Sequence, residues 1–180
     1  VMEALSPDSM INRARPDAVL VAVDMRGLPL SATLAGGETG EQAVERCMAH
    51  LDAIREGLRT NGGAPSLVQT VARPPETVFG NFDPAFGSSP RAMIDALNAR
   101  IAASIAETPD LLVDVAGLAE TVGLGRWHDD TAWNMAKLPF SGTFIPLYAD
   151  HVCRVIAALR GKSGRCLVLD LDNTVWGGVV

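Results

Sequence analysis

Short apolar runs alternate along this chain with segments of helical period. Four runs are rich in apolar and β-branched residues and are predicted as strands: Ala18 to Asp24, Leu67 to Val71, Leu111 to Val115, and Cys166 to Leu171. The first and the last are almost continuously apolar, which is typical of strands that are covered on both faces of a parallel sheet. The pattern therefore predicts a buried, mostly parallel sheet.

Between these runs, apolar residues recur every three or four positions, which predicts amphipathic helices. Three such segments are predicted as helices, at about 44–58, 90–105 and 144–159. The first helix should end at the turn formed by residues 61–63, which reads Asn-Gly-Gly. The second should begin with Ser89 as N-cap and Pro90 at its first position, and the last should end at Gly161.

Strands that alternate with helices predict an α/β fold of three α/β/α layers. A polar stretch, Lys162-Ser163-Gly164, precedes the final apolar run, and no further helix follows that run within the chain. We therefore expect one domain over residues 1–161, a linker over 162–164, and the first strand of a second, truncated domain over 165–180.

The composition restricts the function classes. The 180 residues are 48% hydrophobic, which is sufficient for the core of one ordinary domain. A net charge of −6 without any run of Lys or Arg gives no basic surface for nucleic acid or an anionic membrane. No stretch approaches the roughly 18 apolar residues of a membrane span. Three widely spaced cysteines suggest neither a disulfide framework nor a zinc site, so we expect a cytoplasmic protein.

The strongest chemical signal is the carboxylate pair in the final stretch, CLVLDLDNTVWGGVV, residues 166–180. Asp170 and Asp172 are two residues apart, so in a strand both side chains point to the same side. They would emerge at the carboxyl end of a buried strand, where α/β proteins bind ligands. Two carboxylates there favour a hard cation such as Mg²⁺ and permit phosphoryl transfer. The alternative is a strand that ends in a solvated acidic turn.

This stretch carries a resemblance. The sequence DLDNT after an apolar run resembles the first motif of the haloacid dehalogenase superfamily. The resemblance implies that Asp170 is the nucleophile that becomes phosphorylated and that Asp172 is the general acid and base. It also implies that Asp170 and Asp172 bind Mg²⁺ and that Asn173 and Thr174 contact phosphate.

Two longer segments narrow the resemblance to FkbH-like proteins, of subfamily IIIC type. They are LDLDNTVWGGVV at the end and RWHDDTAWNMAKLPFSGTF over 126–144. The resemblance implies a phosphorylated three-carbon substrate and the loading of a glyceryl unit onto an acyl carrier protein. The later motifs of the superfamily would lie beyond Val180, so we expect these 180 residues alone to be inactive. The alternative is a binding module that docks an acyl carrier protein or a synthase without catalysis.

In FkbH-like proteins the region before the phosphatase-type domain is similar to an SGNH hydrolase, a three-layer flavodoxin-like fold. The catalytic residues of active SGNH enzymes are not found here. No Gly-Asp-Ser occurs. The run VAVDMRG after the first strand keeps Asp24 but has no Asn, and Met135 and Leu138 replace the Asp and His of D-x-x-H. We expect a catalytically silent domain that lacks its first strand and helix. An active esterase would need a nucleophile that the sequence does not offer.

The segment 126–144 supplies the remaining candidates. His128 lies beside two carboxylates and could be a base or a metal ligand, whereas His50 and His151 are expected to be partly exposed helix residues. The alternative assigns the neighbouring Asp129 or Asp130 to capping a helix. Lys137 could meet a phosphate, or it could be a solvated lysine.

The same segment is rich in aromatic residues. These are Trp127, Trp133, Phe140 and Phe144, and they could pack in the core or line a substrate or carrier surface. Together with the cations Arg126 and Lys137, we expect this segment to form the edge of a surface that recognises an acidic carrier protein.

Overall fold

The computed structural model describes residues 2–30 and 37–162. Three parallel strands form one sheet in the order β1-β2-β3: β1 is Val19–Val21, β2 is Ser66–Gln69 and β3 is Leu111–Val113. In the register, Leu20 is opposite Leu67, and Val68 is opposite Leu112. Three of the four predicted strands are thereby confirmed. The fourth, Cys166 to Leu171, lies outside the described residues.

Each strand is shorter than its apolar run predicts. The clearest case is β3, which we expected to continue to Val115. Instead Asp114 is the N-cap of helix α5 (Val115–Val122), and its carboxylate accepts a hydrogen bond from the backbone N–H of Gly117 at 3.1 Å. A cap requires non-helical backbone followed by helix, so the apolar run Leu111 to Val115 is divided between a strand and a helix.

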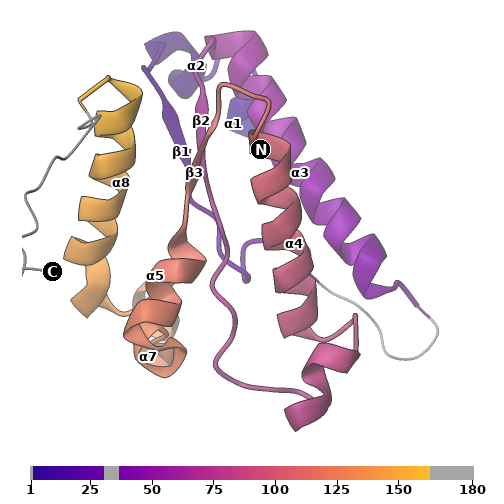
Figure 1. Ribbon diagram of the computed structural model, residues 1–180. Coiled ribbons are helices and arrows are strands. Elements are labelled where there is room, and N and C mark those ends of the chain that lie inside the picture. The colour runs from indigo at the N-terminus through magenta and orange to yellow at the C-terminus, as the bar shows by residue number, and fades with distance from the viewer. Residues whose placement is uncertain (1, 31–36, 163–180) are drawn as a thin grey trace, which may run out of the picture.

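The sheet lies between two layers of helices (Figure 1). Helices α3 (Gly40–Gly62) and α4 (Pro90–Ile105) lie side by side on one face, and α5 and α8 (Ile145–Leu159) cover the other. The predicted α/β/α layering is therefore confirmed for the described residues. None of the helices in this part of the chain is long and apolar enough to cross a membrane.

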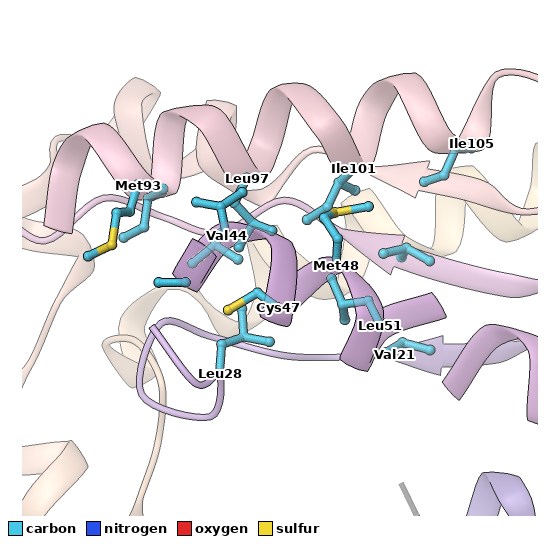
Figure 2. Close-up of a cluster of buried hydrophobic side chains, with 14 of the residues drawn as sticks. Val21, Leu28, Val44, Cys47, Met48, Leu51, Met93, Leu97, Ile101 and Ile105 are labelled. Atoms are coloured by element: carbon cyan, nitrogen blue, oxygen red, sulfur yellow. The ribbon is translucent and has the colours of Figure 1, made fainter. Parts of the chain in front are cut away.

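The layer formed by α3 and α4 buries the larger core. Figure 2 shows Cys47, Met48 and Leu51 of α3 facing Leu97 and Ile101 of α4, above the sheet. These five side chains are almost completely excluded from solvent, and they belong to the stripes that predicted the two helices. Burial of that apolar surface is the main force that fixes the helices on the sheet.

The opposite face is covered by a core of different composition. Trp127 is only 1% exposed and stacks on Phe140 at 4.5 Å and on Phe144 at 5.9 Å between ring centroids. Phe140 in turn contacts Tyr148 of α8 at 5.1 Å. Aromatic stacking therefore attaches the segment before α8, and α8 itself, to the sheet.

The predicted helix ends agree with the structure. Helix α3 has Thr39 as its N-cap in a capping box with Gln42, and Gly63 ends it in the left-handed conformation at φ 71°. In α4 the Ser89 hydroxyl caps the backbone N–H of Ala92 and Pro90 is the first residue. Helix α8 begins one residue later than expected and is followed by Gly161, also left-handed at φ 68°.

Short elements complete the described chain. They are α1 (Met2–Leu5), α2 (Met10–Ala14), the 3₁₀ helices η1 (Gly80–Ala85) and η2 (Gly142–Phe144), α6 (Leu124–Trp127) and α7 (Asp130–Ala136). In the long connection before α4, buried Asp83 accepts hydrogen bonds from the backbone N–H groups of Val78 and Phe79. The connection is thus ordered by its own polar contacts rather than by a strand or a long helix.

One buried ion pair links the helices to the sheet. Arg55 of α3 and Asp110, which precedes β3, are 8% and 5% exposed, and their side chains meet at 2.7 Å between Nε and Oδ2. The other carboxylate oxygen of Asp110 accepts the backbone N–H of Ser66, the first residue of β2, at 2.8 Å. The Arg55 guanidinium also donates to the hydroxyl and carbonyl oxygens of Ser104 in α4.

Removing Asp110 should be costly, because the buried guanidinium of Arg55 would keep only the exposed Asp52 as an ionic partner and the backbone N–H of Ser66 would lose its acceptor. We expect Asp110→Ala to lower the free energy of unfolding by about 3–5 kcal/mol, measured by urea denaturation. The exposed pair between Glu45 and Arg100 is the matched control, and Glu45→Ala should cost at most about 1 kcal/mol. Equal losses in the two variants would contradict this role for Asp110.

Candidate ligand site at the carboxyl edge of the sheet

The carboxyl ends of the three strands meet at one edge of the sheet, which is where α/β folds place ligand sites. Polar residues occupy this edge: Asp24 lies three residues after β1, Gln69 is the last residue of β2, and Asp114 follows β3. In Figure 1 this is the end at which β3 runs into α5 and near which α7 lies. Asp114 is used structurally, because it caps α5 and also accepts a hydrogen bond from the Thr70 hydroxyl at 2.9 Å.

A cavity of about 300 Å³ opens at this edge. Its walls come from the chain after β1, from the end of β2, from α7 with the loop that follows it, and from α8. The side chains relevant to its chemistry are Asp24, Gln69, Trp133, Lys137, Phe140 and Tyr148. The volume lies at the lower end of the range for small-molecule sites. It therefore suits a compact metabolite rather than an extended chain.

A chain of hydrogen bonds forms one wall of the cavity. The Tyr148 hydroxyl donates to Oε1 of Gln69 at 2.9 Å, and Nε2 of Gln69 donates to the backbone carbonyl of Val23 at 2.6 Å. Burial raises the pKa of Tyr148, because the phenolate would lose solvation. The wall therefore presents a neutral phenol in a fixed orientation, together with an amide that is already oriented by its own partners.

Trp133 forms an aromatic wall that is flanked by two cations. The guanidinium carbon of Arg26 lies 4.5 Å from the indole centroid, and Nζ of Lys137 lies 5.2 Å from it. Arg26 also pairs with the exposed carboxylate of Asp130 at 3.2 Å. Lys137 has no ion-pair partner among the residues that the structure describes, so its charge is available to a ligand.

His128 borders a smaller pocket that adjoins the cavity and shares Asp24, Gln69 and Phe140 with it. Its Nε2 lies 2.8 Å from the carbonyl oxygen of Arg73. Because a carbonyl only accepts, Nε2 carries the hydrogen, and Nδ1 is left buried without a partner within the described part of the chain. The ring is thus oriented by a backbone group.

The neighbouring acidic residues support the capping interpretation. Asp129 is the N-cap of α7, and its carboxylate accepts the backbone N–H of Ala132 at 3.0 Å. No group of three or more His, Cys, Asp or Glu side chains suited to a metal occurs within 2–30 and 37–162. A metal site at His128 thus has no support in these residues. His50 and His151 lie in α3 and α8 and are partly exposed, as predicted.

The other predicted site residues divide into two groups. Asp170, Asp172, Asn173 and Thr174 lie outside the described residues, so their predicted roles stay predictions. Lys137 is exposed but lies in the wall of the cavity, and Arg126 is placed over the ring of Phe144 at 5.8 Å.

The aromatic residues of the 126–144 segment do not share one role. Trp127 is a core residue, and Phe140 and Phe144 are half-buried against it, as the core-packing interpretation predicts. Trp133 is partly exposed and carries the two cations.

The two residues that stand in place of the Asp and His of D-x-x-H lie at the surface. Met135 is 83% exposed, and Leu138 is also exposed. Among the described residues, neither serine nor cysteine lines the cavity or the adjoining pocket. The hydroxyl-bearing residue Thr70 lines the adjoining pocket, and its hydroxyl donates a hydrogen bond to Asp114.

The sequence did not single out Gln69 and Tyr148. Gln69 interrupts the apolar run Leu67 to Val71 near the carboxyl end of the strand, and this position was an available signal. Tyr148 is the single tyrosine of the chain and lies in an amphipathic helix. Nothing in its spacing connects it to Gln69, because 79 residues separate the two partners.

Comparison with known proteins identifies a similar fold. No family model matches the sequence, and no curated protein matches it either. Among solved structures, the chain is similar to the N-terminal part of the protein BF1531 from Bacteroides fragilis, a crystal structure containing a phosphatase domain complexed with Mg. The TM-score is 0.83 at 21% sequence identity, over 99% of this chain and 46% of that one. The chain therefore shares the fold of that protein and spans less than half of its length.

The burial of Tyr148 can be tested with ultraviolet absorbance, because the chain has a single tyrosine. We expect the phenol to ionise in the folded chain at a pH clearly above the ordinary value of about 10. Since the folded-state pKa is raised, the stabilisation by neutral Tyr148 is present below the ordinary value and is lost as pH rises through the raised one. The urea-unfolded chain is the control, and identical midpoints for the two states would exclude the buried position.

Proposed function

We propose that this chain is the amino-terminal portion of a Mg²⁺-dependent phosphatase-type enzyme of the haloacid dehalogenase superfamily. The observation that carries the proposal is the DLDNT motif, residues 170–174, directly after an apolar run. The similarity of the chain over almost its whole length to part of a phosphatase-containing protein crystallised with Mg supports it.

The donor set fits the metal. Asp170 and Asp172 supply carboxylate and backbone oxygens, and hard oxygen donors are the ligands that Mg²⁺ prefers in proteins. A bound Mg²⁺ would lower the electrostatic cost of bringing an anionic phosphate next to a carboxylate. We assign the metal to Asp170 and Asp172 on this chemistry and on the resemblance of the motif.

The proposed reaction is the hydrolysis of a phosphate monoester in two steps. In the first, a carboxylate oxygen of Asp170 forms a bond to phosphorus, the ester P–O bond breaks, and Asp172 gives a proton to the leaving oxygen. In the second, the oxygen of a water molecule attacks phosphorus while Asp172 takes a proton from that water. The bond between Asp170 and phosphorus breaks, and inorganic phosphate is released. Asn173 and Thr174 would hold the phosphate oxygens.

The resemblance to FkbH-like proteins supports a finer proposal. The substrate would be a phosphorylated three-carbon acid, and its glyceryl unit would be loaded onto an acyl carrier protein. The exposed Arg126 beside Phe144, with the exposed Met135 on the same segment, favours the docking of an acidic partner. Local positive charge would be needed for such an encounter, because the chain as a whole carries a net charge of −6.

The assignment of the nucleophile can be tested in the full-length parent protein. We expect Asp170→Asn to lower phosphate release from an aryl phosphate at least about a thousandfold, because the amide cannot attack phosphorus. Asp172→Asn should also be slow but should still accumulate a phosphorylated protein, detectable by intact mass. Asp8→Asn, a change at an exposed carboxylate near the amino terminus, is the control. Normal turnover in Asp170→Asn would reject the assignment.

The proposed carrier contact should be weak and sensitive to salt. We expect Arg126→Glu to weaken binding of an acidic acyl carrier protein to the full-length protein about tenfold at low salt, and less as salt rises. Arg13→Glu, an identical charge change at an exposed residue of α2, should have little effect in the same titration. Equal effects of the two substitutions would assign the change to net charge and not to this segment.

A further inference from the structure

The cavity at the carboxyl edge of the sheet contains two opposite charges that are not paired with each other. Asp24 and Lys137 both line it, and neither forms an ion pair with any residue that the structure describes. Asp24 is half-buried and Lys137 is exposed, so water can solvate both charges, and a ligand in the cavity would have to replace that water with its own polar groups. Neither charge forms an ion pair within the described part of the fold, so both are available to a ligand.

The backbone at Lys137 determines where its side chain leaves the end of α7. Lys137 ends α7 in the left-handed conformation, with φ 55°, and its N–H bonds to the carbonyl oxygens of Ala132 and Trp133. Glycine is the usual residue at such a helix end, because a Cβ is disfavoured there. A lysine at this position gives up backbone stability and places its ammonium group over the Trp133 wall of the cavity, 5.2 Å from the ring centroid.

The carboxylate of Asp24 is held by its own loop. Its Oδ1 accepts the backbone N–H groups of Arg26 at 3.1 Å and Gly27 at 2.9 Å, which forms a local turn. Oδ2 has no hydrogen-bond partner among the described residues. The turn thus holds the side chain of a residue that lines the cavity, and it leaves one carboxylate oxygen free to accept from a donor group of a ligand.

The remaining walls define the rest of a ligand. Trp133 and Phe140 offer aromatic surface, and Pro139 adds an apolar contact. The phenol oxygen of Tyr148, which donates to Gln69, keeps its lone pairs for a donor from the ligand. A short apolar group against the aromatic walls, with polar groups towards Asp24 and Lys137, would satisfy every feature of the site.

We propose that this cavity binds a small zwitterion of the amino-acid type, with its ammonium group on Asp24, its acidic group on Lys137, and an apolar side chain against Trp133 and Phe140. A phosphate dianion fits less well, because Arg26 at the Trp133 wall is already paired with Asp130 and Lys137 would have to offset both the charge of the phosphate and the repulsion of Asp24. A simple amine or a simple acid would leave one of the two protein charges unsatisfied. The proposal does not depend on the phosphatase assignment, because every residue that it uses lies within 22–148.

The test is calorimetric titration of the 180-residue chain with glycine, L-leucine and L-phenylalanine. We expect saturable binding of L-leucine in the millimolar range or tighter. Two analogues of L-leucine each lack one charged group: 4-methylpentanoate lacks the ammonium group, and 3-methylbutylamine lacks the carboxylate. Each should bind at least about tenfold more weakly than L-leucine. No saturation by any of the three amino acids, or equal affinity for L-leucine and 4-methylpentanoate, would overturn the proposal.

Two substitutions separate the contributions of the two charges. Asp24→Asn keeps the side-chain oxygen that accepts the hydrogen bonds of the turn. It should weaken the binding of L-leucine about tenfold without weakening the binding of 4-methylpentanoate. Lys137→Gly is compatible with the left-handed backbone at this position. It should weaken the binding of both L-leucine and 4-methylpentanoate without weakening the binding of 3-methylbutylamine.

Arg15→Gly is the matched control. It removes another cation at a left-handed helix end, at φ 46°, in a residue that does not line the cavity. Affinity for L-leucine that is unchanged in both cavity variants, or lowered as much in Arg15→Gly, would overturn the proposal. Thermal melting of each variant verifies the fold. The comparison of L-leucine with its two analogues on the unsubstituted chain tests the proposal without any substitution.

Discussion

The buried contact between Arg55 and Asp110 holds the layers of this fold in position. Asp110 immediately precedes β3. Its carboxylate accepts hydrogen bonds from the guanidinium of Arg55 in α3 and from the backbone N–H of Ser66, the first residue of β2. Through Ser104 the same guanidinium reaches α4. Two helices, α3 and α4, and two strands, β2 and β3, are thereby aligned at the amino edge of the sheet. Because the strands are short and parallel, this alignment also determines where their carboxyl ends lie, and hence the shape of the cavity at the opposite edge.

Local physical chemistry made much of the architecture predictable. Helix ends were predictable because Ser89 and Gly63 act within a few residues of their own positions. The Ser89 hydroxyl accepts a backbone N–H of α4, and Gly63 adopts the left-handed conformation that ends α3. Strand ends were less readable, since Asp114 acts as a helix cap inside an apolar run. Periodicity reports which face of an element is buried, but it does not report where a strand gives way to a helix.

The candidate site was less predictable, because its geometry depends on contacts between distant residues. Gln69 and Tyr148 become partners only after the sheet and α8 have packed together. The left-handed conformation of Lys137 results from the way α7 ends, and no sequence pattern predicted it. The motif at 170–174 is the reverse case. Its proposed chemistry rests on five consecutive residues, and these residues and their surroundings lie outside the described part of the chain.

The order of strands in the sheet has a consequence for how the chain reaches its native state. β2 pairs with β1 and β3 pairs with β2, and a single long helix separates β1 from β2 and β2 from β3. No described strand must insert between two that have already formed. Assembly can therefore proceed in the direction of synthesis, with each new strand adding to an existing edge as it leaves the ribosome. Pairing between successive strands also keeps loop-closure costs low for a parallel sheet, which favours rapid folding.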